Sequence, residues 1–295
     1  MIFMDGVLNV LKPPGLTSHD VVVYLRRKLH TKKIGHAGTL DPQAVGVLPL
    51  GVGKATRLLE FMLAADKEYW AELTFGITTD TQDAWGRVLR TSNCADLSLE
   101  EIKSKLGQFM GEIKQTPPDY SAVKVNGIPL YKRSRLGLET KVSPRTVFVY
   151  DFKIIKYKPP RLIFKIHCSK GTYIRTICHD LGESLGVGAH LSFLLRTRVG
   201  GFSIAESILP EKIGLLKEKA LLPLEIGVEN LKKLILTENE LVKIRHGQKV
   251  FLPESTPLAK NIAIFNHQGE LEAIAEILSQ EQKVILKPKK VLKRD

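Results

Sequence analysis

The chain has 295 residues, of which 43% are hydrophobic and 25% are charged. These values are typical of globular proteins and exclude a disordered or collagen-like chain. The length favours one large domain plus a small one. Its 44 Lys and Arg against 31 Asp and Glu give a net charge of +13, which attracts polyanions such as nucleic acid. A soluble basic protein without such a partner has the same composition, so charge alone favours nucleic acid only slightly.

The cysteines point to a reducing compartment. Cys94, Cys168 and Cys178 form no CxxC pair and match no zinc-site spacing, so we expect neither a disulfide framework nor a metal site. The first residues lack the basic and apolar regions of a secretory signal, and no apolar run approaches the length of a membrane span. We therefore expect a cytoplasmic protein.

Helices and strands alternate along the first two thirds of the chain. Apolar spacing, capping residues and β-branched or aromatic alternation distinguish the two. A capping box of Ser98 and Glu101 begins one helix. The predicted helices cover residues 20–30, 53–65, 98–107 and 172–185, and the predicted strands cover 68–76, 146–157 and 162–168.

Residues 122–145 form a basic segment with a different composition. The segment has six Lys and Arg against one acid, Glu139, and it contains Tyr131. Gly127, Pro129 and Gly137 predict that no regular element forms there. Such a segment suits an RNA backbone with a ring available for stacking, and a solvated surface loop explains it equally well.

The composition changes again near Leu221-Leu222-Pro223. Thr237 and Glu240 form a capping box for a short helix that ends at Gly247. Short strands separated by Pro and Gly then predict a small β-rich domain with a basic tail at 287–290. These strands cover residues 249–252, 262–265, 270–277 and 283–286.

The segment with the strongest chemical signal is residues 35–42, GHAGTLDP. Asp41-Pro42 could simply begin a helix, since Asp is a preferred N-cap and Pro a preferred first residue. The glycines permit close approach of the backbone to a ligand, and His36 offers a polar ring that can stack. On physical grounds Asp41 is therefore a candidate functional residue.

This motif resembles the catalytic motif of the TruB family of bacterial tRNA pseudouridine-55 synthases. Further motifs of the family follow in the same order over nearly the whole chain: residues 12–18 (KPPGLTS), 46–48 (GVL), 67–69 (KEY), 79–83 (TDTQD), 121–127 (SAVKVNG), 168–176 (CSKGTYIRT) and 188–191 (GAHL). Leu195 precedes Arg196 where some members of the family have two basic residues.

The resemblance implies an α+β fold. It predicts a pseudouridine synthase domain around a mixed, largely antiparallel sheet over residues 1–225, with an RNA-binding insertion at about 120–146. Residues 226–295 are similar to a PUA domain, a small β-barrel that binds RNA. From the residues alone, only mixed α and β structure with a β-rich end can be predicted.

The resemblance also assigns roles in a reaction without cofactor or metal. Asp41 is expected to be the nucleophile, Tyr69 to stack on the target base and take the C5 proton, and Arg175 to pair with Asp41. The base must leave its stack before reaction. Further residues expected to bind the substrate or support the site are His36, Tyr173, Leu194, Lys12 and Asp83. The residues expected to contact the RNA backbone are Lys124, Lys132, Arg133, Arg135 and Arg196.

The implied function is isomerisation of uridine 55 in the T-arm of tRNA by a stand-alone enzyme. We expect a monomer that needs no guide RNA, no membrane and no obligatory protein partner. Two alternatives are a non-catalytic tRNA-binding or folding chaperone, and the catalytic subunit of a guide-RNA-dependent synthase. The motif at 121–127 and its basic insertion favour the stand-alone enzyme.

Overall fold

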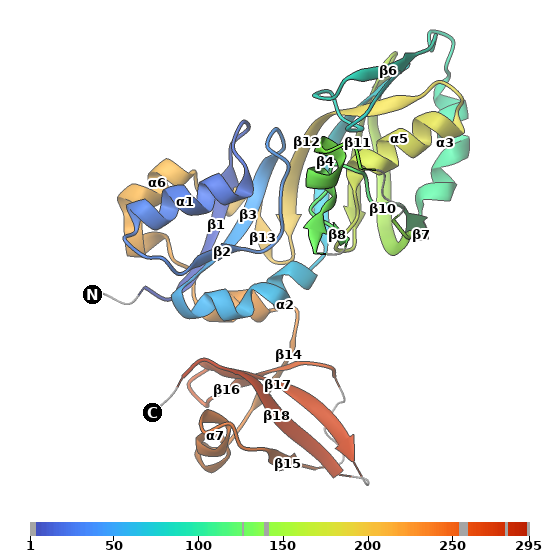
Figure 1. Ribbon diagram of the computed structural model, residues 1–295. Coiled ribbons are helices and arrows are strands. Elements are labelled where there is room, and N and C mark those ends of the chain that lie inside the picture. Colours follow the sequence, from blue (N-terminus) through green and yellow to red (C-terminus); the bar gives the residue numbers. More distant parts are fainter. Residues whose placement is uncertain (1–3, 126, 139–141, 254–258, 281–282, 294–295) are drawn as a thin grey trace.

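The computed structural model describes residues 4–125, 127–138, 142–253, 259–280 and 283–293. A large α+β body is joined to a smaller β-rich part at the C-terminal end (Figure 1). Within the described residues, no helix is both long and apolar enough to cross a membrane.

The large body is built on a nine-stranded sheet in the order β1-β3-β12-β4-β11-β10-β7, with β2 beside β3 and β13 beside β12. Only the pairing of β3 with β12 is parallel, which confirms a mixed, largely antiparallel sheet. The strands are β1 (Gly6–Lys12), β2 (Ile34–His36), β3 (Val45–Val52), β4 (Lys67–Phe75), β7 (Gly111–Gln115), β10 (Arg145–Lys158), β11 (Arg161–Cys168), β12 (Ala189–Val199) and β13 (Phe202–Ser203).

Side-chain capping fixes where several helices begin. Thr17 and Asp20 exchange backbone and side-chain hydrogen bonds at the start of α1, and the predicted boxes at Ser98 and Thr237 begin α3 and α7. The helices are α1 (Ser18–Lys28), α2 (Leu59–Ala64), α3 (Leu99–Leu106), α4 (Leu130–Arg135), α5 (Ile174–Ser184), α6 (Pro210–Leu216) and α7 (Glu238–Arg245). Short 3₁₀ helices cover Gly53–Leu58, Gly107–Phe109, Ile204–Glu206, Lys217–Ala220 and Leu224–Val228.

Helix α5 covers one face of the central strands. Along β4 the residues at 69, 71, 73 and 75 are buried, which is the alternation of a strand with one covered face. They pack with Ile174, Ile177, Cys178 and Leu181 of α5 in one apolar core. The predicted helix at 172–185 therefore exists, and its apolar face positions the first turn of α5 against Tyr69.

Two predictions for local structure need correction, and one alternative is excluded. Residues 53–65 form a 3₁₀ helix followed by the short α2, not one α-helix. Asp41-Pro42 begins no helix, because the chain turns there and enters β3. The basic insertion is not free of regular elements, since it holds the hairpin β8 (Lys124–Val125) and β9 (Ile128–Pro129) followed by α4.

The C-terminal part is a curled five-stranded sheet in the order β14-β16-β17-β18-β15 (Figure 1), which fits a PUA-like domain. The strand predicted at 283–286 is longer than expected, because β18 continues through the basic residues 287–290 to Val291. Pro288 is accommodated at an irregularity in the pairing with β17, where a missing N–H is tolerated. The strands are β14 (Lys232–Ile235), β15 (Val250–Leu252), β16 (Ile262–Phe265), β17 (Leu271–Gln280) and β18 (Lys283–Val291).

The two parts share an apolar core. Phe61 and Met62 of α2 belong to the same buried cluster as Phe265 and Ile274 of the C-terminal sheet. Glu60 adds ion pairs with Lys289 and Lys290 at 2.9 and 3.0 Å. Because this joint is apolar at its centre and charged at its rim, it holds the two sheets in a defined orientation.

Candidate active site

Asp41 lies in the turn that connects β2 to β3. Its backbone carbonyl accepts a hydrogen bond from the N–H of Ala44 at 3.1 Å, which closes the turn. The side chain is 42% exposed, so a ligand can reach the carboxylate. A partly exposed carboxylate on a closed turn is suited to act on a bound molecule.

Arg175 is the ion-pair partner of Asp41. Its Nε lies 3.0 Å from Oδ2 of Asp41, and its side chain is 5% exposed. The other guanidinium nitrogens donate to the carbonyls of Thr81 at 2.9 Å and Tyr120 at 3.0 Å. Since three groups fix the guanidinium, the charge-assisted contact also fixes the orientation of the carboxylate.

The start of α5 is held by a residue that the sequence did not single out. Tyr173, the N-cap residue, has no side-chain cap. Its backbone N–H donates to Oε1 of Gln115 at 2.7 Å, and its carbonyl accepts from Nε2 of Gln115 at 2.9 Å. Gln115 is buried on β7, so it fixes the turn that presents both Tyr173 and Arg175. A lone Gln at the end of a short strand carries no sequence signal for this role.

Asp83 stands at the edge of the same network. Its Oδ2 lies 4.0 Å from Nη1 of Arg175, while its Oδ1 accepts from the hydroxyl of Thr81 at 2.6 Å and from the N–H of Trp85 at 3.0 Å. Asp83 therefore shapes the turn whose Thr81 carbonyl holds Arg175.

Lys12 supports the turn of Asp41 from below. The side chain is fully buried, and its ammonium donates to the carbonyls of Pro13, Leu16 and Pro42 at 2.7–2.9 Å. Burial lowers the pKa of Lys12 to about 8, although the nearby carboxylate of Asp41 raises it. Through its hydrogen bond to Pro42, Lys12 ties the turn of Asp41 to the segment that follows β1.

Tyr69 and Arg196 are directly opposite each other on β4 and β12. Tyr69 is buried, and burial raises its pKa to about 12, although the positive charge of the nearby Arg196 opposes this rise. The Asp41 carboxylate contributes to the rise in the pKa of Tyr69. The phenol is therefore neutral at physiological pH and lies within the electrostatic reach of the carboxylate.

The expectation that Arg196 contacts the RNA backbone is wrong in this structure. Its side chain is 1% exposed, and it donates to the carbonyls of Val47 at 2.7 Å, Thr39 at 3.3 Å and Gly38 at 3.2 Å. The burial arises because β12 runs between β3 and β4 and directs this position under the turn of Asp41.

His36 and Leu194 lie on strands next to those that carry Tyr69 and the turn of Asp41. His36 ends β2, and burial, with a smaller effect of Arg196, lowers its pKa, so the ring is neutral near pH 7. Its Nδ1 is buried and has no hydrogen-bond partner among the described residues. Leu194 lies opposite Ala71 and packs on the edge of the apolar core. The structure thus brings a polar ring and an apolar side chain to the strands that carry the site.

The basic insertion begins at the site itself, because Tyr120 accepts a hydrogen bond from Arg175. Lys124 and Lys132 are exposed, and Arg133 is half-buried. The side chain of Arg135 lies outside the described part of the structure. The two lysines are therefore on the surface of a segment that starts at the site.

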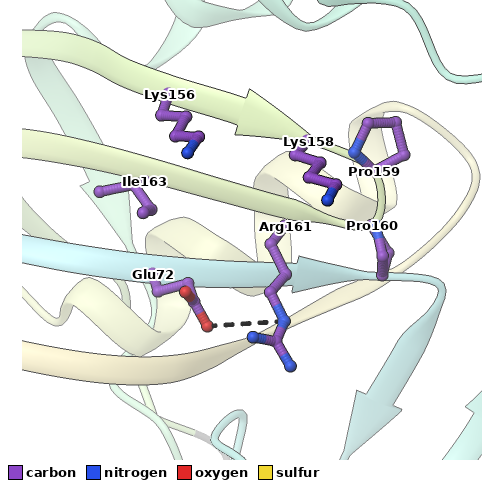
Figure 2. A pocket seen from close by; sticks show the side chains of 7 residues that line it. All are labelled: Glu72, Lys156, Lys158, Pro159, Pro160, Arg161 and Ile163. Atoms are coloured by element: carbon purple, nitrogen blue, oxygen red, sulfur yellow. Dashed lines mark ion pairs between the residues drawn. The ribbon is translucent and has the colours of Figure 1, made fainter.

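A separate pocket of about 340 Å³ lies at the turn of the β10–β11 hairpin (Figure 2). Glu72 and Tyr69 point to opposite faces of β4 because side chains alternate along a strand. The pocket therefore opens on the face away from Tyr69 and is not part of the site. Its lining residues are Glu72, Lys156, Lys158, Pro159, Pro160, Arg161 and Ile163.

Comparisons with known proteins agree on one family. Residues 26–174 match the model of the TruB family pseudouridylate synthase N-terminal domain, and residues 175–236 match the tRNA pseudouridylate synthase B C-terminal domain. Proteins named tRNA pseudouridine synthase B are similar in sequence. The one from Heliobacterium modesticaldum is 40% identical, covering 99% of this chain and 96% of its own length, and one from Streptococcus pyogenes is 43% identical, covering 98% and 99%.

A solved structure shares the fold. A chain in the crystal structure of a Cbf5-Nop10-Gar1 complex superposes with a TM-score of 0.79 at 30% sequence identity, covering 99% of this chain and 86% of that chain. The similarity therefore extends through the C-terminal sheet as well as the large body.

Replacing Arg196 with Lys should destabilise the protein while keeping the charge. One ammonium cannot reproduce the guanidinium contacts to Val47, Thr39 and Gly38, and each buried carbonyl left unpaired costs about 1–3 kcal/mol. We expect the free energy of unfolding in urea to fall by at least about 1–3 kcal/mol. Arg161→Lys on β11, whose side chain is 67% exposed, is the control and should change it by about 0.5 kcal/mol or less. Equal stabilities of the two variants would contradict the role of Arg196.

Proposed function

The chain belongs to the TruB family of pseudouridylate synthases, and we propose that it is a tRNA pseudouridine synthase acting on uridine 55 of the T-arm. The observation that carries the proposal is the oriented carboxylate of Asp41, held 3.0 Å from the buried Arg175 and beside the opposed pair Tyr69 and Arg196. The reaction is an isomerisation, so it needs no second substrate.

The chemistry requires one bond to break and one to form at the ribose. The N1–C1′ glycosidic bond breaks, the uracil rotates, C5 bonds to C1′, and the proton on C5 is lost while N1 gains one. A carboxylate can serve as the nucleophile, whether on the base or on the sugar. Asp41 takes this role, because it is the partly exposed carboxylate that Arg175 holds in one orientation.

Tyr69 supplies the ring beneath the uracil and a relay for the C5 proton. With a pKa of about 12, the phenol cannot act as a free phenolate at neutral pH. The phenol of Tyr69 can receive the C5 proton only if it passes its own proton to another group at the same time. The Asp41 carboxylate can accept that proton once its bond to the nucleoside breaks.

His36 occupies or reads the space left by the flipped bases, and Tyr173 and Leu194 line the pocket around the target uracil. The target must be extruded to reach Asp41, and the space it leaves must be occupied. The neutral ring of His36, whose Nδ1 has no partner among the described residues, suits a hydrogen bond to a base. Leu194, on β12, offers an apolar contact to the uracil.

The RNA is held mainly through its backbone. The basic insertion with Lys124, Lys132, Arg133 and Arg135 contacts phosphates, which fixes the register of the T-arm.

The enzyme works alone in the cytoplasm. Similar bacterial proteins are named tRNA pseudouridine synthase B, which favours a stand-alone monomer over a guide-dependent subunit. Incubation with one unmodified tRNA and no guide RNA separates this enzyme from both alternatives, since a chaperone or a guide-dependent subunit would form no pseudouridine.

Replacing Asp41 with Asn should abolish pseudouridine formation and leave tRNA affinity within a few-fold. The amide keeps the shape but removes the nucleophile. Tritium release from C5-labelled tRNA measures turnover, and filter binding measures affinity. Asp151→Asn, on β10, is the control and should keep parental turnover. Turnover by Asp41→Asn at the parental rate would exclude Asp41 as the nucleophile.

Replacing Tyr69 with Phe should lower the catalytic rate about 10²- to 10⁴-fold, the range for removal of an acid–base group. Affinity should barely change, because Phe still stacks. The control is Tyr157→Phe, which removes another tyrosine hydroxyl, one that donates to the carbonyl of Leu97 at 2.7 Å. Both variants should lose about 1 kcal/mol of stability, but only Tyr69→Phe should lose rate. A Tyr69→Phe enzyme with the parental rate would reduce Tyr69 to stacking.

Replacing the exposed Lys124 and Lys132 together with Ala should weaken tRNA binding and flatten its salt dependence. Removing one cation that neutralises a phosphate lowers the slope of log K against log salt by about one unit, so we expect a decrease of about two. The exposed Lys212 and Lys219, replaced together with Ala, are the control. An identical slope for the two double variants would show that the insertion does not bind the RNA backbone.

A further inference from the structure

The hairpin of β5 (Ile77–Thr79) and β6 (Val88–Thr91) exposes apolar side chains that the proposed mechanism does not use. Trp85 is 69% exposed in the turn between the two strands, and Val88 and Leu89 are also exposed. Arg87 beside them is exposed as well. An indole flanked by a cation on an open surface is a feature of surfaces that bind single-stranded nucleic acid.

The turn that carries Trp85 is fixed by its own hydrogen bonds. Oδ1 of Asp83 accepts the N–H of Trp85 at 3.0 Å, and Oδ1 of Asp80 accepts the N–H of Arg87 at 2.8 Å. A Cβ at Gly86 would lie 2.3 Å from Oγ1 of Thr81, so the backbone is closely packed there. Because the backbone is already ordered, a ligand that contacts the ring needs to order little of the protein.

The same turn is part of the wall of the candidate active site. The Thr81 carbonyl accepts from Arg175 at 2.9 Å, and Oδ2 of Asp83 lies 4.0 Å from that guanidinium. The N–H of Ala84 donates to the carbonyl of Leu191 on β12 at 2.9 Å. Trp85 follows Asp83 by two residues, so their Cα atoms are at most about 7.6 Å apart. The indole is therefore anchored at the rim of the site.

We propose that Trp85 is an RNA-binding residue that stacks on a nucleobase of the T-arm next to the target uridine. This inference rests on the proposed function. A base that leaves its stack exposes a π-face, and an aromatic ring held at the rim can cover it. Stacking is insensitive to base identity, so Trp85 contributes affinity and placement of the loop rather than sequence reading. The exposed Arg87 adds a cation for the neighbouring phosphates.

The chain has only two tryptophans, Trp70 and Trp85, which makes the inference directly measurable. Trp70 precedes Ala71 on β4 and points to the face of the sheet away from Tyr69. A Trp70→Phe protein therefore reports on Trp85 alone, and a Trp85→Phe protein reports on Trp70 alone. Both are made in the Asp41→Asn background, which prevents turnover.

The probe is a T-arm stem-loop RNA titrated into each protein while tryptophan emission is recorded. We expect saturable quenching of the emission of Trp85 and little change in that of Trp70. Equal responses of the two proteins, or no response of Trp85 in a protein that filter binding shows to be loaded with RNA, would overturn the inference. Failure of both proteins to bind the RNA would overturn the inference and the proposed function together.

Affinity provides the second readout, in proteins that retain Asp41. Trp85→Ala should weaken T-arm binding about 5- to 100-fold, the range for removal of one stacking side chain, while Trp85→Phe should recover most of that affinity. The rate at saturating RNA and the melting temperature should stay near parental values, which separates a binding role from a structural one. Parental affinity of Trp85→Ala in an enzyme that forms pseudouridine would remove this inference and leave the proposed function intact.

Discussion

The candidate active site depends on a buried cation, Arg196. A buried guanidinium is costly unless hydrogen bonds satisfy its donors. The carbonyls of Gly38, Thr39 and Val47 accept from it, and Tyr69 lies opposite it on β4. These three acceptors belong to the turn of Asp41 and to β3. Because one side chain satisfies all of them at once, neither segment can move without leaving a buried polar group unpaired.

This constraint explains why a glycine follows the turn of Asp41. Gly46 pairs with Arg196 across the parallel contact of β3 and β12, and a Cβ at Gly46 would lie 2.2 Å from the carbonyl oxygen of Arg196. The φ of Gly46 is 121°, a conformation that other residues rarely adopt. The next residue, Val47, supplies the carbonyl for the guanidinium. The motif at residues 46–48 is therefore a packing requirement of the buried arginine rather than a second set of reacting groups.

The sequence predicted the capped helices and the alternating strands, because their signals are local. It did not predict β1 and β3, whose residues are mostly buried, or β12, and none of the three shows clean alternation; β3 also includes Pro49. The family resemblance indicated Asp41 and Arg175, and the structure places them 3.0 Å apart. Arg196 was assigned to the RNA backbone because sequence composition does not reveal the burial of a charge. Gln115 was missed because only the folded chain brings β7 to the start of α5.

The three cations around Asp41 also resolve an electrostatic conflict. A carboxylate that must approach a polyanion is repelled by the phosphates, and burial of the site would strengthen that repulsion. Arg175 contacts the carboxylate. Burial lowers the pKa of Lys12 and of Arg196, and the nearby Asp41 carboxylate opposes part of that decrease in each. The three cations therefore offset the negative charge of Asp41. The side chains that hold the turn in place therefore also make the approach of Asp41 to RNA electrostatically favourable.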